Sequence, residues 1–204
     1  MAKIIMAVGR GRGPYYAPDK PEKKDPEYYE IVAGSQVGEF TYEQATVWAA
    51  AHDRFDAQAR HEFNREQLEK VARETYKISN PGSAVDFLLS EGVLVEVDLE
   101  TEIPTEFFKR YRLIPTGTCA GNIPDRRDLY RLVVGEASTV VNRQALGIWT
   151  YSYLHGSIWE GCKSLSKAFR KRGKDAPPEA FANEVAIFLP AIVAIEAGVV
   201  EPVA

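Results

Sequence analysis

The chain has 204 residues, of which 45% are hydrophobic and 26% are charged, and its formal net charge at pH 7 is -4. This composition is typical of a globular protein with one or two cores, and it argues against a protein whose whole surface serves nucleic acid. The two cysteines, Cys119 and Cys162, match no metal-ligand spacing. We therefore expect free thiols in a reducing compartment, with no metal and no cofactor.

The sequence contains no pattern that predicts a membrane protein. The first residues lack the long apolar stretch of a secretory signal. The most apolar segment, residues 185–195, is interrupted by Pro190 and is shorter than the roughly 20 residues that a bilayer requires. We expect a cytoplasmic protein without a membrane contact.

The first half alternates short apolar runs with polar helix-capping residues. The expected elements, in chain order, are a strand at residues 3–8, a Gly- and Pro-rich loop at 9–27, strands at 29–32 and up to Phe40, three helices that begin after Thr41, Asn64 and Asn80, and a strand at 93–97. Side chains of Thr and Asn can accept hydrogen bonds from the first-turn N–H groups, which is why they mark the helix starts.

The second half repeats this order. Its expected elements are a strand at residues 111–114, a loop at 115–128, strands at 129–134 and 139–141, helices that begin after Asn142, Ser157 and Pro177, and a final strand after Gly198. Gly92 and Gly198 are expected to mark the same point in the two halves, at the end of the third helix.

Residues 28–48 align without a gap to residues 129–149, at a constant offset of 101. Four aligned positions are identical: Tyr29/Tyr130, Val32/Val133, Gly34/Gly135 and Trp48/Trp149. We therefore predict an α+β fold of two tandem units, 1–98 and 110–204, joined by a linker at 99–109. Each unit would hold a small antiparallel three-stranded sheet and three helices.

Three segments of the second half, residues 130–149, 157–169 and 177–200, carry a resemblance to a known family. Their order of strand, Gly turn, short strand, polar cap and three helices ending in Gly-Val resembles the PqqD-like family, the recognition elements for ribosomally made peptide natural products. The resemblance covers residues 112–203 well and 4–97 more loosely. It implies two winged-helix units that do no chemistry and present a precursor peptide to a modifying enzyme.

The resemblance also implies where the peptide binds. The leader region of the precursor would add as a strand to the sheet edge and pack against the third helix. The implied peptide-binding residues of the second unit are Thr139, Val140, Val141, Val185, Leu189 and Ile192, and those of the first are Glu39, Phe40, Val85 and Leu89. The expected partners are an acidic leader peptide and its modifying enzyme.

Two other functions remain open. A winged helix can read DNA, but neither candidate recognition helix is basic, because residues 78–98 and 175–204 contain no Lys or Arg. The second alternative is a structural module that forms a homodimer through the apolar third helix of the second unit. No nucleophile or metal motif surrounds His52, His61 or His155, so we expect a protein that is not an enzyme.

One basic cluster lies on the face and at the end of the second helix of the second unit. It consists of Lys163, Lys167, Arg170, Lys171, Arg172 and Lys174. Two interpretations apply: a solvated helix end, where positive charge suits the helix dipole, or a docking patch for an acidic peptide or a phosphate backbone.

Overall fold

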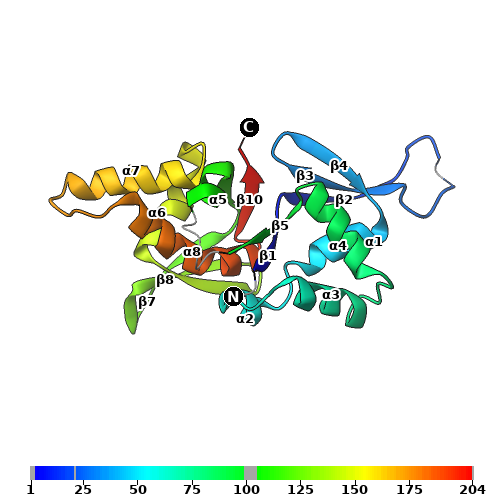
Figure 1. Cartoon of the computed structure of the whole chain (residues 1–204), viewed down its shortest axis with the longest axis horizontal. Coiled ribbons are helices and arrows are strands. Elements are labelled where there is room, and N and C mark those ends of the chain that lie inside the picture. The colour runs from blue at the N-terminus through cyan, green and yellow to red at the C-terminus, as the bar shows by residue number, and fades with distance from the viewer. Residues whose placement is uncertain (1–2, 21, 99–104, 204) are drawn as a thin grey trace.

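The computed structural model describes residues 3–20, 22–98 and 105–203. It confirms the predicted α+β class, with two small units side by side (Figure 1). The first unit contains β1 (Ile4–Ala7), β2 (Arg10–Tyr15), β3 (Tyr28–Ala33), β4 (Gln36–Phe40), α1 (Tyr42–Ala50), α2 (Phe55–Ala59), α3 (Arg65–Glu74), α4 (Pro81–Ser90) and β5 (Leu94–Val97). The second contains α5 (Thr105–Arg110), β6 (Tyr111–Pro115), β7 (Thr118–Ile123), β8 (Arg126–Val134), β9 (Ala137–Asn142), α6 (Arg143–Tyr151), the 3-10 turn η1 (Ser152–Leu154), α7 (Ile158–Arg170), α8 (Pro178–Ala194) and β10 (Gly198–Pro202).

The strands pair in the same way in both units. Strands β2, β3 and β4 form one antiparallel three-stranded sheet, and β7, β8 and β9 form its counterpart. In each unit the first and last strands form a separate antiparallel pair, β1 with β5 and β6 with β10. The order of the three-stranded sheets places β4 and β9 at an edge.

Four of the expected polar residues cap helices, whereas Asn80 precedes α4 without a side-chain cap. The Thr41 hydroxyl accepts the Gln44 N–H at 3.3 Å while the Gln44 side chain accepts the Thr41 N–H at 2.9 Å, which completes the predicted capping box. Asn64, Asn142 and Ser157 each accept one first-turn N–H in the same manner. These local hydrogen bonds are why the helix starts could be located from sequence.

Two expected loops contain strands. Residues 9–27 include β2, and residues 115–128 include β7 and the start of β8. The glycines of β2 predict a loop, but at Gly11 the glycine allows close packing: a Cβ there would lie 3.2 Å from the ring of Trp48. The expected linker also differs in part. Residues 99–104 lie outside the described residues, while α5 forms just after them and buries Phe107 and Phe108.

The ends of α4 and α8 fix how the two units correspond. Each helix is followed by a residue in the left-handed region, Gly92 with φ 69° and Glu196 with φ 56°. The next N–H in each unit, that of Val93 or Ala197, donates back to a helix carbonyl at 3.1 and 3.0 Å, respectively. Gly92 therefore corresponds to Glu196, whereas the sequence predicted that it corresponds to Gly198. Since the helix ends coincide, the extra length of α8, 17 residues against 10 in α4, lies at its N-terminal end.

The two units share one hydrophobic core. The contact between them is asymmetric, because it involves α2, a helix that has no counterpart among the described residues of the second unit. Helix α2 packs on α8, where His61 Nε2 lies 3.1 Å from the Ile187 carbonyl oxygen. Nearby, the Gly9 N–H donates to the Val200 carbonyl at 2.8 Å. The first unit has room for α2 because 14 residues join α1 to α3, whereas only six join α6 to α7.

Candidate functional site: the edge of β4 and the adjoining cavity

Strand β4 has one open edge. It pairs with β3 on one side, and no strand of the described residues pairs with the other side. The two-residue turn closes on the Ala33–Gln36 pair. The alternation of an antiparallel ladder therefore points the N–H and C=O groups of Val37 and Glu39 away from β3. An extended chain could pair with these groups.

A cavity of about 220 Å³ lies directly beyond the end of β4. It opens where the N-terminal ends of α1 and α4 meet. Its lining consists of Thr41, Glu43, Gln44, Asn80, Ser83, Ala84 and Phe87. We refer to the open edge of β4 together with this cavity as the β4 site.

Exposed apolar side chains surround the β4 site. Val37 on the strand is 53% exposed, and Tyr42 at the start of α1 is 61% exposed. Phe87 of α4 is 39% exposed and packs edge-on against the buried ring of Phe40, with ring centres 6.2 Å apart. Free main-chain groups beside exposed apolar side chains are what strand addition requires.

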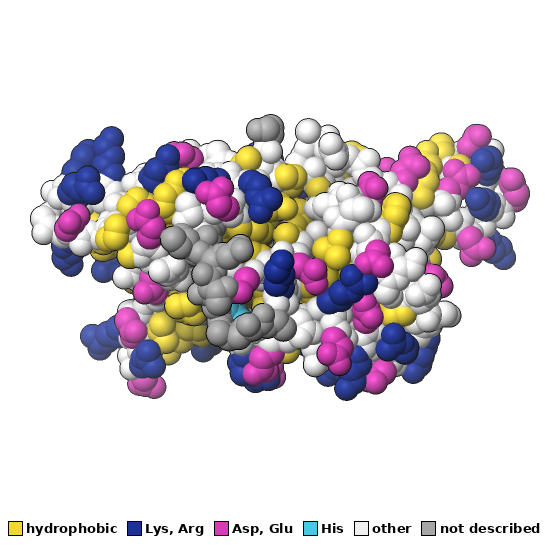
Figure 2. Space-filling model, in the orientation of Figure 1, with side chains coloured by type: hydrophobic (Ala, Val, Ile, Leu, Met, Phe, Trp, Pro, Cys, Tyr) yellow, Lys and Arg dark blue, Asp and Glu magenta, His cyan; other side chains and the backbone are white. Residues whose placement is uncertain are grey.

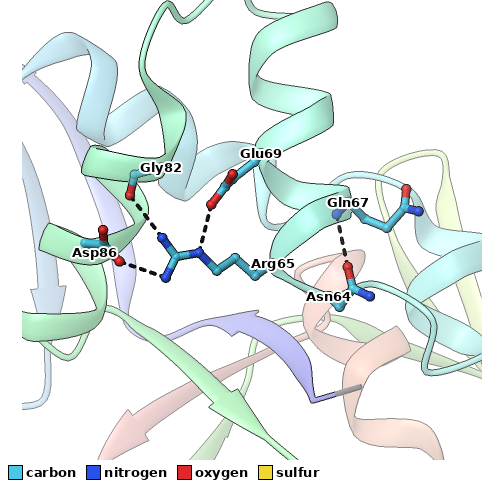
Figure 3. Close-up of polar contacts among 6 residues, drawn as sticks. All are labelled: Asn64, Arg65, Gln67, Glu69, Gly82 and Asp86. Atoms are coloured by element: carbon cyan, nitrogen blue, oxygen red, sulfur yellow. Dashed lines mark hydrogen bonds and ion pairs between the residues drawn. The ribbon is translucent and has the colours of Figure 1, made fainter. Parts of the chain in front are cut away.

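A cluster of polar contacts holds α4 against α3 (Figure 3). Arg65 Nε lies 2.7 Å from the Glu69 carboxylate, and Arg65 Nη1 lies 2.7 Å from the Asp86 carboxylate. Arg65 Nη2 also donates to the carbonyl of Gly82 in the first turn of α4 at 3.4 Å. Hydrogen bonds to Asp86 and Glu69 raise the pKa of Arg65, so the guanidinium keeps its charge. This cluster positions the helix that forms one wall of the β4 site.

In the second unit, two side chains bridge the place that corresponds to this cavity. Thr41 and Asn80, which line the cavity of the first unit, correspond to Asn142 and Glu184. The Asn142 side-chain amide donates to the Glu184 carboxylate, so the N-terminal extension of α8 is tied to the start of α6. The edge of β9 pairs with no other strand of the described residues, and α8 is in contact with this strand.

Most of the sequence-predicted peptide-binding residues belong to the core. In the second unit Thr139, Val141, Val185, Leu189 and Ile192 are buried and Val140 is half-buried; in the first unit Phe40 and Val85 are buried, Leu89 is half-buried and Glu39 is exposed. These buried side chains belong to the hydrophobic core, so they are not accessible to a ligand at either sheet edge. Of these predicted peptide-binding residues, Glu39 alone is exposed.

Sequence reasoning identified Glu39 on the edge of β4 but missed Val37 and the residues that line the cavity. Phe87 and Val37 were the detectable signals, because each is a large apolar residue outside the buried face of its element. The cavity was not detectable, since it forms where the N-terminal ends of α1 and α4, which are far apart in sequence, meet in the fold.

The predicted basic cluster is exposed at the end of the second unit where α7 ends (Figure 2). Within it, Lys163 pairs with Glu160 at 2.5 Å and Arg170 with Asp175 at 3.7 Å. The other four members form no ion pair with a described residue. The cluster therefore forms a solvated positive surface on the second unit, on different elements from the β4 site.

The structure also shows the surroundings of His52 and of the two cysteines. Burial lowers the pKa of His52, which packs edge-on against Trp48. Burial raises the pKa of the Cys162 thiol to about 12, while Cys119 is exposed. Among the described residues, no three His, Cys, Asp or Glu side chains come together as metal ligands would. None of the helices in that part of the chain is long and apolar enough to cross a membrane.

Comparison of the chain with protein-family models, with curated proteins and with solved structures finds no match in any of the three.

Proposed function

We propose that the protein is a non-catalytic adaptor that binds an extended peptide as an additional strand on β4. The observation that carries the proposal is the difference between two equivalent places. The first unit leaves an edge strand open beside a cavity of about 220 Å³, whereas in the second unit the Asn142 amide and the Glu184 carboxylate of α8 bridge the same place. The first unit would bind, and the second would support it through the shared core.

The physical basis is main-chain pairing with side-chain selection. An added strand would pair with the outward N–H and C=O groups of Val37 and Glu39, which supplies affinity without regard to sequence. Its alternate side chains would point toward Phe87 and the cavity, and these contacts would select among peptides.

The resemblance to the PqqD-like family supplies the biological role that we propose. In that role the peptide is the leader region of a ribosomally made precursor, and the adaptor presents it to a modifying enzyme. The proposal moves the main site from the second unit, where the resemblance fitted the sequence best, to the first. Winged-helix architecture in the sense of that family is part of the same proposal.

DNA binding has less support. A helix that enters the major groove presents Lys or Arg to phosphates and bases. Neither α4 nor α8 contains a Lys or an Arg, and the exposed end of α4 carries Asp86 and Glu91. The basic cluster lies on α7 and the residues after it, where a surface contact with phosphates would depend strongly on salt.

A matched pair of variants tests the proposal. Peptides would be selected on the intact protein from a displayed library of random linear sequences, and their affinities measured by fluorescence polarisation. Val37→Pro should abolish binding, because proline removes an outward N–H of β4. Ser138→Pro, at the corresponding position of β9, should leave affinity unchanged.

Two outcomes would overturn the proposal. One is the selection of no peptide; if duplex DNA also stays bound at moderate salt, this result favours DNA binding instead. The other is peptide binding that Val37→Pro leaves intact, since the peptide would then be held elsewhere.

A further inference from the structure

The further inference rests on the proposed function and concerns the kind of peptide that the β4 site selects. Side chains on β4 alternate between two faces. Gly38 and Phe40 point toward the core, while Val37 and Glu39 are exposed on the other face. An added strand would therefore place two of its own side chains next to Val37 and Glu39, two residues apart.

Glu39 carries an uncompensated charge. Its cross-strand partner on β3 is Glu30, and like charges directly opposite one another destabilise a sheet. Glu30 already has a cation, Arg12, whose Nη1 lies 3.2 Å from its carboxylate. Glu39 forms no ion pair with any described residue. The open edge of the sheet thus presents a free carboxylate to whatever strand is added.

The net charge of the first unit also favours a positively charged ligand at the β4 site. Residues 1–98 contain 12 Lys and Arg against 17 Asp and Glu, which gives a net charge of -5. Residues 105–204 contain 13 basic and 10 acidic residues, which gives +3. The β4 site therefore lies on the acidic unit, and its counterpart beside β9 lies on the basic unit.

The charges around the cavity do not oppose the binding of a positively charged peptide. The N-terminal ends of α1 and α4, which carry partial positive charge, both border it. The Glu43 carboxylate in the first turn of α1 offsets that charge. Selection by charge therefore belongs to the Glu39 face of the strand, and the cavity selects by shape and hydrogen bonding.

We propose that the β4 site takes a basic peptide, with Lys or Arg beside Glu39 and an aliphatic or β-branched residue beside Val37. The ammonium or guanidinium group would pair with the Glu39 carboxylate, whose neighbour on β3 is another anion, Glu30. The aliphatic side chain would cover the exposed Val37. The intervening side chain points to the other face, beside Phe87 and the cavity. The partner is thus the opposite in charge of the acidic leader peptide that was expected.

The test uses peptides selected on the intact protein from a random linear library, each then synthesised with Lys, Gln or Glu at its central basic position. We expect the Lys form to bind about three- to tenfold more tightly than the Glu form, with the Gln form between them. The difference should shrink as salt is raised, because exposed charges are screened. Glu39→Lys should reverse the order of the three peptides, and Glu39→Gln should remove it.

The control is Glu136→Lys, which makes the same change of charge in the turn between β8 and β9 of the second unit. The order of affinities should not change in this variant. If Glu39→Lys leaves the order unchanged, or if the selected peptides are acidic, the charge preference is wrong.

A second measurement separates this failure from failure of the proposed function. Methylating alternate backbone nitrogens of the peptide blocks strand pairing in one register without altering its charge. Binding that requires unmethylated nitrogens and shows no preference for Lys sinks only the charge inference. Binding that tolerates methylation in both registers, or the selection of no peptide at all, sinks strand addition and the charge inference with it.

Discussion

At the scale of single residues, one position distinguishes the two edge strands. Gly38 of β4 faces Ile31 across the sheet, and its counterpart Thr139 of β9 faces Leu132. Thr139 is buried, whereas Gly38 places no side chain under the strand. The glycine is needed where it stands, because a Cβ there would lie 2.5 Å from Cε2 of Phe40.

We predict that Gly38→Ala lowers the free energy of unfolding by about 1–3 kcal/mol, because the buried Phe40 ring must move to admit the methyl group. Gly156→Ala is the matched control. No atom lies within 4 Å of a Cβ at Gly156, so this change should be neutral or stabilising by up to about 1 kcal/mol. Urea denaturation measures both. An equal effect of the two substitutions would contradict the packing described around Gly38.

At the scale of elements, the sequence predicted the parts of the fold that rest on local chemistry. Caps such as Thr41 and Asn142 satisfy N–H groups three residues away, so neighbouring residues reveal them. Strands β2 and β7 could not be recognised, because their glycines and polar residues are typical of loops. In β2 the reason for one glycine is tertiary, since the ring of Trp48 packs on Gly11. The β4 site was hidden for a similar reason. Its cavity forms where the N-terminal ends of α1 and α4 meet, and its counterpart in the second unit is found only by matching Gly92 with Glu196.

The wall of the β4 site gives a prediction at this scale. Arg65→Met removes the guanidinium that joins α3 to α4 through Glu69, Asp86 and the Gly82 carbonyl. Since the Arg65 side chain is 36% exposed, solvent screening limits the expected loss of stability to about 1 kcal/mol. Arg60→Met breaks only the exposed contact with Glu62 and should cost less than about 0.5 kcal/mol. If the two variants unfold at the same urea concentration, the cluster does not hold α4.

At the scale of the whole molecule, one buried carboxylate lies between the two units. Glu201 of β10 has a side chain that is 2% exposed, and its Oε2 accepts a hydrogen bond from Arg112 Nη2 at 2.8 Å. From the first unit, Arg10 Nε approaches its other oxygen at 3.9 Å. That oxygen has no hydrogen-bond partner among the described residues. The charge is thus held mainly by its own unit and only weakly across the interface.

We predict that Arg112→Met destabilises the protein by about 1–3 kcal/mol, because it leaves the Glu201 carboxylate buried without its closest cation. Arg10→Met should cost at most about 1 kcal/mol, since that side chain is 62% exposed and its contact is long. Thermal and urea unfolding should each show one transition, as expected for units that share a core. A larger effect of Arg10→Met would mean that the charge chiefly joins the two units.

The central claim, that a peptide adds as a strand to β4, is tested most directly by amide hydrogen exchange of the labelled protein with and without a selected peptide. Exchange at Val37 and Glu39, whose N–H groups point away from β3, should slow by about tenfold or more in the complex, because the added strand accepts their hydrogen bonds. The corresponding amides of β9, at Ser138 and Val140, should exchange as before. Unchanged exchange at Val37 and Glu39 in a saturated complex, or protection at Ser138 and Val140 instead, would contradict the account.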